Sequence, residues 1–119
     1  MSSTKELVYE MLRTLGVNVD NLLSDDVARI QVHKNKVLGL HLVPGVDVQA
    51  EELEDGIEAY VEIKEGAKIE KPIHLCFGVM PEEGIQKIKI HLRAKEKSKS
   101  MILAHCTFPK AKNVKHLME

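Results

Sequence analysis

A chain of 119 residues with a net charge of −1 is long enough for one domain that buries its own core. Only 3% of the residues are aromatic and Trp is absent, so the core must be built from Ile, Leu and Val. The near-neutral charge argues against nucleic-acid binding, which needs several basic residues on one face. The densest basic stretch, residues 93–99, is predicted to be a solvated loop.

Cysteine usage and hydropathy indicate the cellular compartment in which the protein is expected. Cys76 and Cys106 lie far apart, so they form neither a disulfide framework nor a CxxC metal motif. The first residues do not resemble a signal peptide, and no apolar run approaches the about 18 residues of a membrane span. These features predict a protein of the reducing cytoplasm without membrane association.

Residues 1–16 are predicted to form an amphipathic helix. Ser3 and Glu6 have the spacing of a capping box, and Gly16 stands where a left-handed C-cap is expected. Between them the apolar residues fall on one helical stripe. This stripe must cover either the domain's own sheet or a partner, and it consists of Leu7, Val8, Met11, Leu12 and Leu15.

After the polar residues at 24–26 the apolar period changes from 3.6 to 2. Residues 26–43 are therefore predicted to form a β-hairpin, in which apolar positions alternate with polar ones. Lys34-Asn35 is the expected tight turn, since Asn tolerates a positive φ. Pro44-Gly45 ends the second strand.

The rest of the chain alternates between short strands and turns. Residues 51–56 are predicted to be an acidic, solvated turn, and strands are expected at 57–63, 73–80, 88–92 and 101–108. One helix and about six or seven short strands make a mostly β domain. Periodicity alone does not choose among a sandwich, a barrel and a solenoid.

No motif for nucleotide binding or hydrolysis is present, so a free-standing enzyme is not expected. Strand parity places His74 and Cys76 on one face, and it places His105 opposite Cys106. Cys76 is interpreted as a small buried hydrophobe, and these four residues form only a weak zinc signal because alternation divides them. The other strand histidines are predicted to be exposed: His33, His41 and His91.

Two segments resemble the SufB/SufD family of iron–sulfur cluster assembly scaffolds. Cys106, Thr107 and Pro109 match that family's Cys-Thr-Ala-Pro strand motif, with Phe108 in place of the small residue, and His116 matches the His that opens its next strand. Residues 63–75 are similar to the beginning of the family's β-helix. The resemblance covers residues 56–119 and marks the chain as a short, partial member.

The resemblance implies a short parallel β-helix, or solenoid, in which Cys106 is the candidate sulfur-accepting or iron-binding residue. His116, His105 and Cys76 are weaker candidates. No resident cofactor is implied, although an iron–sulfur cluster or persulfide sulfur would be handled. Implied partners are SufB/SufD proteins and a SufC-type ATPase, although the usual SufC-binding region has no counterpart here. An uncapped solenoid face predicts a homo-oligomer.

Three hypotheses for function stay open. The first is a scaffold or accessory module in iron–sulfur cluster assembly that handles sulfur or iron through Cys106. The second is a purely structural or interaction protein of the same fold, in which Cys106 is part of the core. The third is a β domain that binds a small molecule or a metal.

Overall fold

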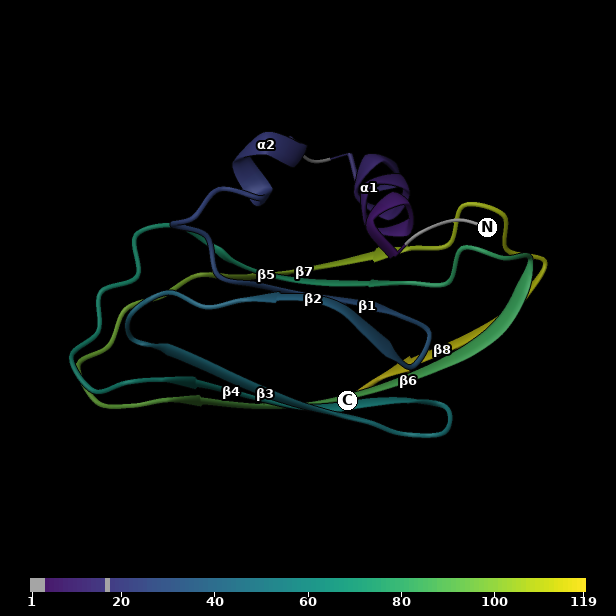
Figure 1. Cartoon of the computed structure of the whole chain (residues 1–119). Coiled ribbons are helices and arrows are strands. Elements are labelled where there is room, and N and C mark those ends of the chain that lie inside the picture. Colours follow the sequence, from purple (N-terminus) through teal and green to yellow (C-terminus); the bar gives the residue numbers. More distant parts are fainter. Residues whose placement is uncertain (1–3, 17) are drawn as a thin grey trace.

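The computed structural model describes residues 4–16 and 18–119, so the Ser3 end of the predicted capping box lies outside it. Within these residues the chain forms two helices and eight strands (Figure 1). The helices are α1 (Thr4–Thr14) and α2 (Val19–Leu22). The strands are β1 (Arg29–His33), β2 (Lys36–His41), β3 (Val46–Glu52), β4 (Gly56–Ile63), β5 (Ile73–Gly78), β6 (Glu83–Ala94), β7 (Ile102–Thr107) and β8 (Asn113–Met118).

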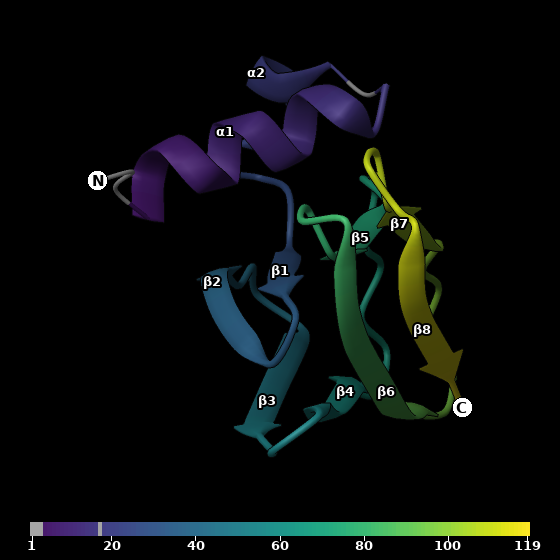
Figure 2. The same ribbon diagram turned by 90° about the vertical axis from the view of Figure 1, so that its right-hand side faces the viewer.

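The strands form two four-stranded sheets that lie face to face (Figures 1 and 2). Sheet A has the order β2-β1-β5-β7, and sheet B has the order β3-β4-β6-β8. Strands β1, β5 and β7 are parallel, as are β4, β6 and β8. From β4 onward the chain crosses to the other sheet after every strand, so β7 and β8 become the edge strands at one margin of the two sheets. We call this margin, formed by β7 and β8, the β7–β8 margin.

The expected mostly β domain is confirmed, and the described residues form no closed barrel. Both sheets are mixed, because β2 pairs with β1 and β3 pairs with β4 in the antiparallel sense. The parallel β-helix therefore stays a prediction. The β1–β2 pair lies where the alternating pattern predicts a hairpin.

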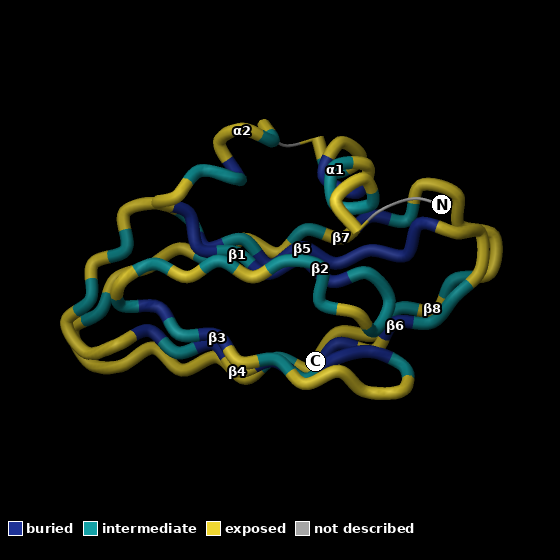
Figure 3. The backbone as a smooth tube through the Cα atoms, viewed as in Figure 1, coloured by how far each residue is buried: buried dark blue, intermediate teal, exposed yellow. Residues whose placement is uncertain are grey.

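The main core lies between the two sheets (Figure 3). Alternate residues of each strand point inward, which is the consequence of the two-residue period of a strand. The core is aliphatic, as the composition predicts, and Phe77 is the one ring in this cluster of described residues. Its most buried members include Ile30, Val32, Ile57, Ile63, Ile73 and Ile88.

A second apolar layer lies on the outer side of sheet A, where α1 and α2 cover it (Figures 1 and 2). Met11 and Leu12 of α1 are fully buried there, together with Leu22 of α2. The predicted stripe of α1 thus docks on the domain's own sheet. Gly16 has the positive φ of +72° that its predicted C-cap position requires. We call this outer side of sheet A the helix-facing side.

Three elements go beyond the sequence prediction. Strand β3 begins at Val46 and extends to Glu52, so the acidic turn is shorter than residues 51–56. Glu52 is held in place because its side chain accepts a hydrogen bond from the Val37 backbone N–H at 2.8 Å. The other two elements are the short helix α2 and the last strand, β8. The described residues thus form eight strands, because tertiary pairing extends segments with little periodicity of their own.

The hairpin turn also differs in detail from the prediction. The positive φ of 55° belongs to Lys34, not to Asn35. The Lys34 backbone is fixed in this conformation because its N–H donates to the Gly78 carbonyl at 3.0 Å. The Asn35 side chain instead donates to the Leu53 carbonyl at 2.8 Å, which ties the hairpin to the β3–β4 turn. Tertiary hydrogen bonds therefore override the local preference of Asn for a positive φ.

Candidate functional site

Cys106 lies on the edge strand β7 and is an exposed, free cysteine. It is the register partner of Phe77, whose ring is in the core between the sheets, so Cys106 points toward sheet B. Partial burial raises the pKa of its thiol above the ordinary value. At neutral pH the thiol is therefore mostly protonated, and a nearby base is needed to form the thiolate.

His116 lies on β8, the other strand of the β7–β8 margin. It is the register partner of Gln86, which is fully buried, so its ring points toward sheet A. The ring packs against Phe108, with centroids 4.9 Å apart and an interplanar angle of 59°. Burial lowers the pKa of His116, which favours the neutral imidazole.

Cys106 and His116 therefore share one margin of the fold and both face the space between the sheets. The contact of Phe108 with His116 holds the end of β7 against β8. A thiol and a neutral imidazole that face the same space between two sheets are the two parts that thiolate chemistry requires.

Cys76 is in a different environment. It is completely buried on the helix-facing side of sheet A, where it packs with Met11, Leu12 and Leu22. Burial raises the pKa of its thiol to about 12. The interpretation of Cys76 as a small buried hydrophobe agrees with this placement, and the structure offers no access for chemistry at its sulfur.

His74 and His105 form a hydrogen-bonded pair on the helix-facing side. His74 Nδ1 and His105 Nε2 are 2.9 Å apart, and the ring planes differ by only 11°. A distance this short joins the rings edge to edge through one N–H···N bond. Burial, together with His105, lowers the pKa of His74. His105 therefore lies on the opposite side of β7 from Cys106, as strand parity predicts.

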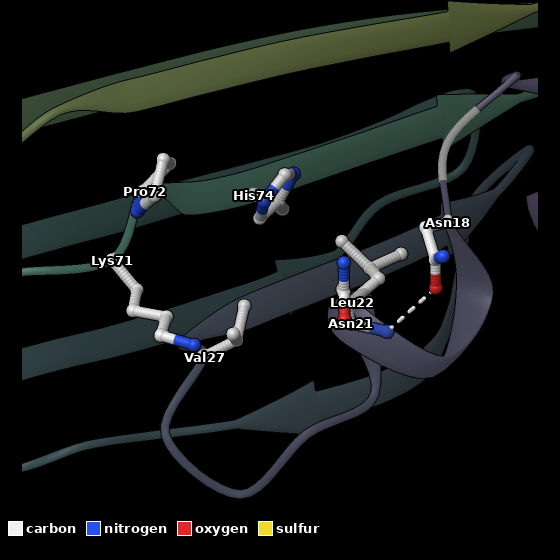
Figure 4. Close-up of a pocket in the computed structure, with 7 residues that line it drawn as sticks. All are labelled: Asn18, Asn21, Leu22, Val27, Lys71, Pro72 and His74. Carbon is white, nitrogen blue, oxygen red and sulfur yellow. Dashed lines mark hydrogen bonds between the residues drawn. The ribbon is translucent and has the colours of Figure 1, made fainter.

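A pocket of about 410 Å³ opens beside His74, between α2 and the beginning of β5 (Figure 4). Its described lining contains one charged side chain, Lys71, which is paired with Asp26 at 3.3 Å. The other lining residues are Asn18, Asn21, Leu22, Val27, Pro72 and His74. Sheet A separates this pocket from Cys106, so the two do not form one site.

The weak zinc signal from His74, Cys76, His105 and Cys106 gains no support. Three of these residues lie on the helix-facing side, and Cys106 points the other way. Among residues 4–16 and 18–119, no group of three or more metal-ligating side chains is close enough to hold an ion. The structure thus places Cys106 and His116 on the two strands of the β7–β8 margin, whereas His105 and Cys76 lie on the helix-facing side of sheet A.

The sequence analysis was wrong about one polar residue, His33, and did not consider another, Gln86. The interpretation of His33 as an exposed strand residue is wrong, since its ring is half-buried and its Nε2 accepts a hydrogen bond from the Met80 backbone N–H at 3.1 Å. Gln86 is fully buried beside His116, and a polar residue at an inward position of β6 is the one signal that would have found it. His91 is exposed as predicted and pairs with Glu58 at 2.7 Å, whereas His41 is half-buried.

Two curated proteins are similar to this chain over nearly its whole length. The chain is 35% identical over 111 residues to an iron–sulfur cluster assembly SufBD family protein of Pyrococcus horikoshii, covering 93% of this chain and 34% of the relative. It is 29% identical over 120 residues to a SufBD family protein of Methanocaldococcus jannaschii, covering 99% of this chain and 38% of the relative. No protein-family model and no solved structure matches the chain.

These matches place the chain among relatives of iron–sulfur cluster assembly proteins. The resemblance to the SufB/SufD family is confirmed: the chain is homologous over nearly its whole length to SufBD family proteins. The similarity also extends over the N-terminal half, beyond the residues 56–119 that carry the motifs. The chain spans about a third of the length of the curated relatives it matches. No described helix is long and apolar enough to cross a membrane.

Proposed function

We propose that this chain is a scaffold or accessory module in iron–sulfur cluster assembly and that Cys106 is its sulfur- or iron-handling residue. The names of both relatives, iron–sulfur cluster assembly SufBD family proteins, support the general role. The single observation that carries the residue assignment is the exposure of Cys106 on β7, at the same margin as His116, while the other cysteine is sealed in the core.

The proposed chemistry is a transfer of sulfane sulfur from a donor persulfide. His116 takes the thiol proton, and the Cys106 thiolate attacks the terminal sulfur of the donor. A new S–S bond forms at Cys106 while the donor's S–S bond breaks, and the donor leaves as a thiolate. The step involves no net oxidation. The same thiolate can instead ligate iron, which is then cargo of the assembly process.

The proposal includes partners. Exposed apolar side chains lie on the edge strands, among them Leu103 of β7 and Leu117 of β8, and edge strands are templates for pairing with further strands. We propose assembly with another copy of the chain, with SufB/SufD proteins or with a SufC-type ATPase. In this proposal the strands of the partner add to β7 and β8 and continue the two sheets as a parallel β-helix.

One observation favours the alternative of a purely structural or interaction module. The pKa of Cys106 is raised, whereas a nucleophilic cysteine is expected to have a lowered pKa. In this alternative the margin binds a partner and its thiol has no chemical role. The chemical proposal therefore depends on a base at the margin, and His116 is the described residue placed for it.

Anaerobic reconstitution with iron and sulfide, followed by visible absorption, tests the proposal. We expect a sulfur-to-iron charge-transfer band in the wild type and its loss in Cys106→Ser. Cys76→Ala is the matched control, since it removes the other thiol from the core, and we expect it to keep the band. A band that survives in Cys106→Ser contradicts the assignment.

A further inference from the structure

An arginine without a salt bridge lies next to the pocket between α2 and the beginning of β5. Arg29 is half-buried, and its Nη1 donates to the carbonyls of Leu22 and Val27, which both line the pocket, at 3.3 and 3.5 Å. Its Nε is buried without a hydrogen-bond partner among the described residues, and none of the ion pairs within residues 4–16 and 18–119 includes Arg29. Charges that leave water are ordinarily paired, so the surroundings of Arg29 favour an anion.

Lys71 adds a second positive charge from the turn before β5 (Figure 4). Its ammonium pairs with the carboxylate of Asp26 at 3.3 Å, but both side chains are more than half exposed. Because an exposed ion pair contributes little, a carboxylate from solution can replace Asp26 at small cost. Asp26 itself is not part of the pocket wall, and the described lining contains no Asp or Glu. The charge on the pocket wall is therefore available to an anionic ligand.

His74 supplies a hydrogen-bond donor on the β5 side of the pocket. Its Nδ1 is engaged with His105 Nε2 at 2.9 Å. When His105 donates in this bond, Nδ1 holds the lone pair of a neutral His74 ring, so His74 Nε2 carries the hydrogen. This Nε2 has no hydrogen-bond partner within the part of the chain that the structure describes, and His74 lines the pocket. An anion in the pocket can accept its N–H.

The rest of the pocket suits an apolar group. Leu22, Val27 and Pro72 contribute to the lining, and the first two are almost completely buried. The volume of about 410 Å³ lies within the range of about 300–1,000 Å³ that small-molecule sites occupy. Such sites combine a mostly apolar lining with a few polar groups that orient the ligand. The pocket thus matches a ligand with one anionic group on a compact apolar body.

We infer that this pocket binds a small monocarboxylate with a compact apolar body. The carboxylate lies between the Lys71 ammonium and the His74 Nε2–H, and the positive charge of Arg29 next to the lining stabilises it. The apolar body packs on the apolar part of the lining. The site lies on the helix-facing side of sheet A, away from Cys106. It is therefore a binding activity beyond the proposed role in iron–sulfur cluster assembly.

Titration of the ¹⁵N-labelled protein with benzoate, followed by ¹H–¹⁵N correlation NMR, tests the inference. We expect saturable shifts of amides around the pocket, among them those of Asn21, Val27 and His74, and none at Cys106. Benzamide is the matched neutral probe, with the same ring and no charge, and it should bind several-fold more weakly. Absence of saturable shifts at the pocket, or equal binding of benzoate and benzamide, overturns the inference.

Two exposed residues separate the role of charge from that of shape. Lys71→Met should weaken benzoate binding about 2–5-fold, the range that exposed ion pairs give. Asp26→Asn should strengthen it by a similar factor, because the Lys71 ammonium loses its competing carboxylate. Lys36→Met is the matched control: Lys36 is an exposed lysine of β2 that pairs with Glu52 at 3.7 Å, and its loss should leave binding unchanged.

Benzoate affinity that stays at the wild-type value in folded Lys71→Met and in Asp26→Asn contradicts a carboxylate bound at Lys71. The outcome is separate from that of the proposed function. The benzoate titration decides whether the pocket binds an anion, whereas loss or survival of the charge-transfer band in Cys106→Ser decides whether Cys106 handles iron and sulfur.

Discussion

Cysteine and leucine side chains are buried on the helix-facing side of sheet A but exposed at the β7–β8 margin. On the helix-facing side, Cys76 and Leu12 have no exposed surface. At the margin, Cys106 is exposed and Leu117 is 52% exposed. The difference is one of coverage, because α1 and α2 lie over the first surface while β7 and β8 are the outer strands of their sheets.

This comparison separates a region that contributes to stability from the region where we propose the chemistry. A buried cysteine with a pKa of about 12 packs like an aliphatic residue, and changing its surroundings changes the free energy of unfolding. An exposed cysteine on an edge strand contributes little to packing and is accessible to a donor or to iron. The predictions below separate these two roles, beginning with the larger effect.

Leu12→Ala should destabilise the protein strongly, by about 2–5 kcal/mol, because it leaves a cavity between α1 and sheet A. Leu117→Ala is the matched control at the margin, and it should change stability by less than about 0.5 kcal/mol. Urea denaturation followed by circular dichroism measures both. Equal effects of the two variants would show that α1 is not docked as described.

Protonation of His33 at acid pH is expected to have a smaller effect on folding stability. Burial lowers the pKa of this ring from the ordinary value of 6.5, and its Nε2 is occupied by the Met80 N–H. The charges that act on the ring are those of Lys34, which lowers the pKa further, and Glu10, which opposes this. The unfolded chain therefore takes up a proton more readily than the folded one, so stability is lost as pH falls through 6.5 toward the lowered pKa.

His33→Gln keeps an acceptor for Met80 without a titrating ring. We expect thermal stability to fall less between about pH 7.5 and about pH 5.5 in this variant than in the wild type. Because His74 and His116 also have lowered pKa values, part of the acid loss should persist. His41→Gln, on β2, serves as the control. An acid loss in His33→Gln as large as that of the wild type would refute the role of His33.

Much of the fold follows from periodicity. The stripe of α1, the alternation in β1 and β4, and the aliphatic core are all properties of local sequence. Strand β3 and the positive φ of Lys34 were not predictable in this way, because contacts with distant segments determine them. The hydrogen bonds from Val37 to Glu52 and from Lys34 to Gly78 join residues that no local pattern relates.

The candidate site was predictable in part. Strand parity separated Cys106 from His105, and the family motif pointed to His116 as its second landmark. The sequence could not show which cysteine is exposed, because both lie in apolar strands. The position of β7 at the edge of sheet A distinguishes Cys106. The position of the buried Gln86 beside His116 likewise depends on a register between β6 and β8 that no local pattern specifies.

The most direct test of the central claim is anaerobic treatment of the native protein with a low-molecular-weight persulfide, followed by peptide mass spectrometry. We predict one added sulfur atom on the Cys106 peptide, none on the Cys76 peptide, and no addition in Cys106→Ser. Equal loading of both cysteines, or loading of Cys76 alone, would contradict the claim that the β7–β8 margin carries the chemistry.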